Sequence, residues 1–166
     1  MRTTWRWPRD HDESDLIVSE MDEVIPALVA AVQEQHATGD HYRDDAIRQA
    51  MEHQAQLALR PGPVRVDVIV DPPWSDGQIN SVQVVTGDRP FLVDTVASCL
   101  LRHGWRVEDV RHPIIGVKRD RGTIEAVGTP GRGGCASESW IHIDVTAPLG
   151  TDIGQAAEQL RDDLCA

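Results

Sequence analysis

The chain has 166 residues, of which 40% are hydrophobic and 26% charged, and its formal net charge is −11. These values are typical of a globular domain large enough to bury a core. Nucleic-acid phosphates and anionic lipid surfaces attract clustered Lys and Arg, so the acidic balance argues against a nucleic-acid or membrane partner. The longest apolar run, residues 25–32, is too short to span a bilayer. The first residues also carry no secretory signal pattern, and we expect a cytoplasmic protein.

The first third of the chain is expected to be an acidic leader followed by two helices. Positions 10–23 hold seven acidic residues and no Lys or Arg, a pattern typical of a solvated or disordered segment. A helix is predicted from residue 22 or 23 to Gly39, with Pro26 in its first turn. A second helix is predicted over residues 43–59, which Pro61-Gly62 ends.

After residue 62 the apolar period changes from that of a helix to that of a strand. Valine occupies every second position of residues 64–70, and residues 81–86 repeat the pattern, so both are predicted strands with one buried face. The next segment, from Leu92 to Gly104, has helical spacing and a glycine stop.

The rest of the chain is predicted to hold further strands and a last helix. The strands are expected within residues 105–118, 122–127 and 140–145, and the helix is capped by Thr151 or Asp152. Pro113 cannot donate to a strand ladder, which predicts an edge position or a bulge near His112.

This order of elements indicates an α+β fold. We expect a ferredoxin-like sandwich, a mostly antiparallel sheet with helices on one face, preceded by N-terminal helices. The expected division is a leader and helical segment over residues 1–62 and the sandwich over residues 63–166.

The search for chemistry finds no catalytic, cofactor or metal site. The glycine-rich run at residues 131–134 precedes a strand rather than a helix, which favours a hairpin loop over a phosphate site. The histidines form no HxxxH or HExxH motif, and Cys99, Cys135 and Cys165 show no ligand or disulfide spacing. Three unpaired thiols favour a reducing compartment, and Cys99 lies among apolar neighbours, where a thiol is inert.

The junction between the strand at residues 81–86 and the helix after it is the one candidate site. Asp88 can accept hydrogen bonds from the free amides of the helix start, and Pro90 presets a helical φ. The same turn could instead point backbone N–H groups at a ligand carboxylate. The local pattern leaves both alternatives open. The candidate effector-binding residues are Thr86, Gly87, Asp88, Arg89, Pro90, Phe91 and Leu92.

The residues around this junction resemble a known family. The run VVTGDRPFLVDTVASCLLRHGWRVEDV resembles the first strand, helix and second strand of ACT domains. Within it, DRPFLVDTV resembles the Asp-Met-Pro-Phe-Leu-Val-Asp-Ser-Val run of the large bacterial NAD-specific glutamate dehydrogenases. HPII, ESWIHIDV and EHQAQLALRPGPVRV match that family too, and the similarity covers residues 45–166. Gly87 and Thr95 depart from the family, which commonly has Asp and Ser there.

The resemblance implies a non-catalytic N-terminal regulatory or assembly module of an enzyme that converts L-glutamate to 2-oxoglutarate with NAD. The catalytic lysine and the NAD-binding domain of that parent enzyme would lie downstream, so no cofactor is expected in this part. The implied partners are the downstream domains of the same chain and further copies in a homo-oligomer. Amino-acid sensing at residues 86–93 is the alternative function, and a free-standing small enzyme is a third.

Three expectations follow for the structure and its behaviour. The strand at residues 64–70 should pair antiparallel with residues 81–86 and take the place of the ACT domain's usual last strand. The isolated chain should neither bind NAD nor oxidise glutamate. Because Phe91 stands where amino-acid-binding ACT domains usually have Gly, the junction is expected to be a structural corner. Asp88 would then cap the helix, and Phe91 would lie in the core or an interface.

Overall fold

A computed structural model describes residues 16–18, 21–35, 44–75 and 77–166 of the chain. The helices and strands predicted in these ranges are present, with boundaries that differ by a few residues. The helices are α1 (Met21–Gln35), α2 (Asp44–Ala58), α3 (Leu92–Arg102) and α4 (Ile153–Cys165). The strands are β1 (Leu16–Val18), β2 (Val64–Ile69), β3 (Ile79–Gly87), β4 (Arg106–Arg111), β5 (Ile114–Asp120), β6 (Thr123–Gly128) and β7 (Ala136–Thr146).

The described strands form one antiparallel sheet in the order β1-β6-β5-β7-β3-β2, and β4 also pairs with β7. The longest strand, β7, lies at the centre and pairs with β3 on one side and with both β4 and β5 on the other. Strand β2 pairs antiparallel with β3 from Val64↔Thr86 to Ile69↔Ser81, which confirms the predicted position of this strand.

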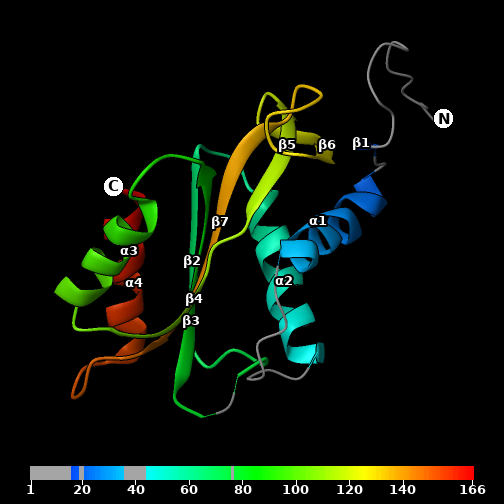
Figure 1. Cartoon of the computed structure of the whole chain (residues 1–166). Helices are drawn as coiled ribbons and strands as arrows, with labels where there is room; N and C mark the ends of the chain where they lie inside the picture. Colours follow the sequence, from blue (N-terminus) through cyan, green and yellow to red (C-terminus); the bar gives the residue numbers. More distant parts are fainter. Residues whose placement is uncertain (1–15, 19–20, 36–43, 76) are drawn as a thin grey trace.

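Helices cover both faces of the sheet (Figure 1). Helices α3 and α4 pack on one face, as expected for an ACT-like sandwich, and share a buried cluster with β2, β3 and β7. Helices α1 and α2 pack on the opposite face, over Val85, Ile115 and Trp140. The N-terminal helices therefore do more than precede the sandwich, because they bury the second face of its sheet. The division of the chain between residues 62 and 63 stays a prediction.

The extended segment predicted around Pro113 consists of two strands, β4 and β5, which both pair with β7. Strand β4 pairs with the end of β7, and β5 pairs with the beginning of β7. Between them the ladder is interrupted at residues 112 and 113, where the carbonyl of Pro113 still accepts the Trp140 amide at 3.0 Å. The register shift in β4 lies between Val107 and Asp109 rather than at His112.

The predicted acidic leader lies mostly outside the described residues. Its described parts are residues 21–23, which begin α1, and β1, a short strand that pairs antiparallel with β6, from Leu16↔Gly128 to Val18↔Ala126. This strand was not predicted, because three apolar residues are too few to establish a period.

Candidate functional site

The β3–α3 junction forms an open hollow at the surface of the domain. Strand β3 ends at Gly87 and α3 begins at Leu92, so four residues make the turn. The hollow has a volume of about 420 Å³. The described residues that line it are Asp88, Arg89, Pro90, Phe91, Leu92, Val93, Asp94 and His112. Five of the seven predicted site residues thus come together, and His112 joins them from the end of β4.

The other two predicted residues belong to the sheet. Thr86 is buried, and its hydroxyl donates to the Pro63 carbonyl at 3.1 Å. Gly87 pairs with Glu138 of β7. These residues hold the end of β3 in place beneath the hollow and do not line it.

Phe91 lies outside the core of the domain, which was one of the two places predicted for its ring. Its backbone is left-handed, with φ 64° and ψ 16°, and its side chain is turned to solvent with 77% of the residue exposed. Both the amide and the hydroxyl of Thr95 donate to the Phe91 carbonyl, at 2.9 and 2.8 Å. The ring therefore does not seal the corner within the domain, so its predicted place in the core is wrong, whereas a place in an interface stays a prediction.

Asp88 does not cap α3, which is a second correction. Phe91 is the N-cap residue, and no side chain among the described residues supplies a capping hydrogen bond. Asp88 Oδ1 accepts instead from the hydroxyl of Ser139, at 2.6 Å, because the β3–β7 pairing brings these residues together. The amides at the start of α3 are thus left without a side-chain acceptor, next to the hollow.

A chain of hydrogen bonds continues from Asp88 across β7 to His112. Ser139 Oγ lies 2.9 Å from His112 Nε2. Since the Ser139 hydroxyl donates its only proton to Asp88, it accepts from His112, whose Nε2 then carries the proton. A serine nucleophile needs the opposite arrangement, with the hydroxyl donating to the imidazole. The three residues fix the shape of the hollow and do not form a nucleophile–base pair.

The family comparison agrees with this architecture. A sequence model described as the glutamate dehydrogenase ACT1 domain matches residues 26–164, which is most of the chain. The chain belongs to this family. No solved structure matches the chain. The match confirms the expected ACT-like domain of glutamate dehydrogenase and includes most of α1 and all of α2. Among the described residues, no helix of the ACT1 domain is long and apolar enough to cross a membrane.

The ACT1 domain buries a polar layer between α2 and the sheet. Gln83 of β3 is fully buried, and its amide nitrogen donates to the Ala50 carbonyl at 2.8 Å and contacts His142 Nδ1 at 3.0 Å. His142 Nδ1 then accepts, so its Nε2–H donates to Asp144 Oδ1, also at 3.0 Å. The oxygen of Gln83 contacts His53 Nδ1 of α2 at 2.8 Å. These polar groups form hydrogen bonds with one another on a face of the sheet that was expected to face solvent.

Asp144 is the titratable group at the end of this layer. Burial disfavours its charged form and raises the pKa of Asp144 from 3.8 to about 6. Arg111 lies 4.0 Å away, and burial lowers the pKa of that guanidinium. Ser81 Oγ is 3.4 Å from the same carboxylate.

Three side chains of types that bind metals lie together near the C-terminal end of α3, whose first turn lines the hollow. Cys99 and His103 come from the end of α3, and Asp163 comes from the last turn of α4. The sequence predicted no metal site here, because short-range motifs of histidine and cysteine do not include a third ligand that is distant in the chain. The CxxxH spacing and a carboxylate sixty residues later are brought together only by the packing of the two helices.

Proposed function

We propose that this ACT1 domain is a non-catalytic regulatory and assembly module of an NAD-dependent glutamate dehydrogenase. The observation that carries the proposal is the family match over residues 26–164. The parent reaction would be L-glutamate, NAD and water to 2-oxoglutarate, ammonia and NADH. In this proposal the catalytic lysine and the NAD site belong to downstream domains of the same chain, and the enzyme is a cytoplasmic homo-oligomer.

A second candidate function, binding of an amino-acid effector, is supported by the open hollow at the β3–α3 junction. Phe91 leaves this space open, and the amides at the start of α3 have no side-chain cap among the described residues. A ligand carboxylate could accept from these amides at the positive end of the helix. Asp88 and Asp94, which also line the hollow, could hold its ammonium group. An α-amino acid carries both groups on one carbon atom.

The two functions are separated by experiments on the domain and on the longer enzyme. Purified chain, mixed with glutamate and NAD, should produce no NADH; detectable turnover refutes the non-catalytic role. Calorimetric titration with the common amino acids should give saturable binding that Asp88→Asn weakens. Gly87→Ala is the matched control, because it adds a methyl group into open space next to Asp88. If no amino acid binds, the assembly role alone remains, and deletion of the domain should change the subunit number of the enzyme.

A further inference from the structure

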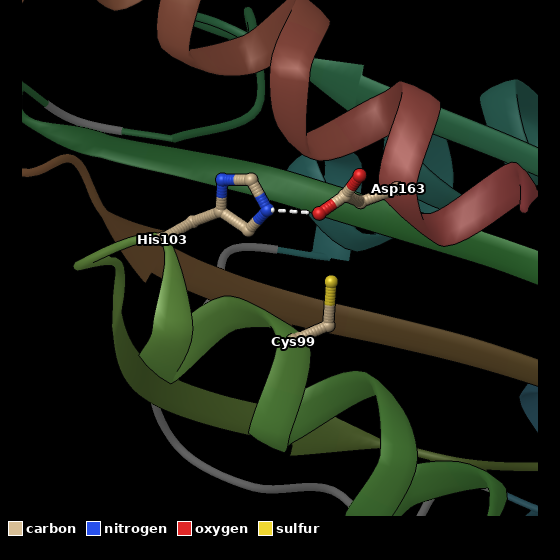
Figure 2. Close-up of side chains that lie close together, drawn as sticks. All are labelled: Cys99, His103 and Asp163. Atoms are coloured by element: carbon tan, nitrogen blue, oxygen red, sulfur yellow. Dashed lines mark hydrogen bonds and ion pairs between the residues drawn. The ribbon is translucent and has the colours of Figure 1, made fainter.

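Three donor atoms of the types that bind transition metals meet where α3 ends against α4. The ligand atoms of Cys99, His103 and Asp163 all lie within 4.8 Å of one another. Figure 2 shows the Cys99 sulfur pointing from α3 into the space between the helices, beneath the contact between His103 and Asp163. In that contact His103 Nε2 lies 2.7 Å from Asp163 Oδ2.

The positions of these residues follow from helix geometry. Cys99 and His103 are four residues apart, so they lie on the same face of α3, one turn above the other. His103 is the C-cap of α3, and Asp163 lies in the last turn of α4. The partial negative charge of a helix is at its C-terminal end, so a cation beside the end of α3 is favoured by the backbone as well as by the side chains.

We propose that Cys99, His103 and Asp163 bind a zinc ion, with water in a fourth position. A thiolate, an imidazole and a carboxylate form a donor set that suits zinc, and three protein ligands with one open position are a common zinc arrangement. The thiolate and the carboxylate together neutralise the charge of the ion. Cys99 is 3% exposed and closes the inner side. The side chain of Asp163 is 56% exposed, so the fourth position faces solvent.

The donor atoms need only small movements to surround the ion. Tetrahedral zinc with bonds of about 2.0–2.3 Å places its donor atoms roughly 3.4 Å apart. The His103–Asp163 contact must widen slightly, and the sulfur must approach by at most about 1.4 Å, which rotation of the side chains can supply. On binding, the Cys99 thiol gives its proton to solvent, and His103 binds through Nε2 as a neutral imidazole whose one proton is on Nδ1.

The site would clamp the two helices of the sandwich together. Helix α3 runs from the β3–α3 hollow at its first turn to the zinc ligands at its last turn. A bound ion would fix the end of α3 against α4 and so stabilise the helix whose start lines the hollow. This role stands apart from the proposed function, since it requires neither an amino-acid effector nor glutamate dehydrogenase activity.

The simplest competing arrangement is an ion pair between His103 and Asp163 with Cys99 as an apolar neighbour. Reduced, chelator-treated chain of 166 residues is titrated with Zn²⁺ by calorimetry and with Co²⁺ by absorption spectroscopy. We expect one ion per chain with a Kd below about 10 µM. Co²⁺ should show a thiolate charge-transfer band and visible bands of tetrahedral intensity, and Zn²⁺ should raise the melting temperature.

Single substitutions identify which side chains bind the ion. His103→Gln, Asp163→Asn and Cys99→Ser should each weaken Zn²⁺ binding by at least about tenfold, since loss of even a residue that supports a ligand has an effect of that size. The matched controls are Cys165→Ser, which removes the exposed thiol of the same helix turn as Asp163, and His112→Gln, which changes a distant histidine. Both should bind as the unchanged chain does.

Three outcomes would overturn the proposal. They are the lack of a tight one-to-one complex, a Co²⁺ spectrum without the thiolate band, and binding that survives His103→Gln or is lost with Cys165→Ser. If Cys99→Ser fails to fold, the exposed Asp163→Asn and the Co²⁺ spectrum still decide the question.

Discussion

The guanidinium of Arg119 holds the carboxylate of Glu138 with two hydrogen bonds, Nε to Oε1 at 2.5 Å and Nη2 to Oε2 at 3.1 Å. This pair is more than a link between β5 and β7. The same guanidinium donates to the carbonyl of Ala58 at the end of α2, at 3.0 Å. The indole nitrogen of Trp140 also donates to Glu138, at 3.2 Å. A single charged pair therefore joins the N-terminal helices to the centre of the sheet.

Replacing Arg119 with Met should lower the free energy of unfolding by about 3–5 kcal/mol, because buried Glu138 would lose the guanidinium that hydrogen-bonds both of its oxygens. Urea unfolding followed by circular dichroism measures the change. Lys118→Met is the matched control on the next residue of β5, where the partly exposed pair with Glu125 at 3.6 Å should contribute less than about 1 kcal/mol. Equal losses in the two variants would contradict a special role for the Arg119–Glu138 pair.

The buried carboxylate of Asp144 should make stability depend on pH. Its pKa rises from 3.8 in the unfolded chain to about 6 in the folded domain, so the folded state holds the proton more tightly. The contribution is fully present below the unfolded pKa and is lost as the pH rises through about 6, by roughly 3 kcal/mol in all. The groups that face Asp144 include His142, Arg111 and Ser81.

Asp144→Asn removes this titration while it keeps the size of the side chain. The free energy of unfolding of the unchanged chain, minus that of the variant, should therefore fall between about pH 4 and pH 6 and stay level above about pH 7. Denaturant melts of both proteins across this range give the curve. A difference that rises with pH would mean that Arg111 and His142 outweigh the burial of Asp144.

Phe91 should be tolerant of truncation because its ring is exposed and its backbone is left-handed. Phe91→Ala should change the free energy of unfolding by no more than about 0.5 kcal/mol. Phe91→Gly should raise it by up to about 1 kcal/mol, since glycine adopts a positive φ without a Cβ clash. Thermal melts compare the variants. A loss of about 3–5 kcal/mol in Phe91→Ala, as for a core phenylalanine, would mean that the ring is buried in solution.

Gly116 of β5 should not accept a side chain. A Cβ atom there would lie 2.3 Å from the Gly128 carbonyl oxygen and 2.6 Å from the Pro130 nitrogen, which are backbone atoms that cannot rotate away. Gly116→Ala should lower the free energy of unfolding by about 1–3 kcal/mol or more. Gly87→Ala, at the end of β3, meets open space and should be nearly neutral. The two urea midpoints, measured side by side, check this difference.

Most elements of the fold could be predicted from local pattern, but the covering of the second sheet face could not. The alternation of Val82 and Val84 with Ser81 and Gln83 is typical of a strand with one solvated face. Instead both faces are buried, because Gln83 finds the Ala50 carbonyl and His142 as partners. A polar side chain can be buried at little cost when its hydrogen bonds are satisfied. Pattern alone cannot report such partners, which lie far away in the chain.

The candidate site shows the same limit. The junction itself could be predicted from its Asp-Arg-Pro sequence, yet the predicted capping by Asp88 and the predicted core position of Phe91 were wrong. The prediction assigned Asp88 to the nearest free amides, whereas strand pairing supplied Ser139 as a better-placed donor. The hydrophobicity of Phe91 predicted burial, but a left-handed backbone turns the side chain away from the core. His112 could be placed at the hollow only once β4 was paired with β7.

The central position of β7 has a consequence for the order in which the domain folds. Strand β3 pairs with β7 from Gly87↔Glu138 to Ile79↔Thr146, so the middle of the sheet closes over a long stretch of intervening chain. Local pieces such as the β2–β3 hairpin can form early, whereas Gln83 has to wait for His142, which is 59 residues away. Such long-range pairing slows folding, because the entropy of closing the loop is lost before the contacts are gained. During synthesis, helices α1 and α2 would therefore leave the ribosome well before the sheet face that they cover. Until that face forms, their apolar sides would be exposed and could bind chaperones.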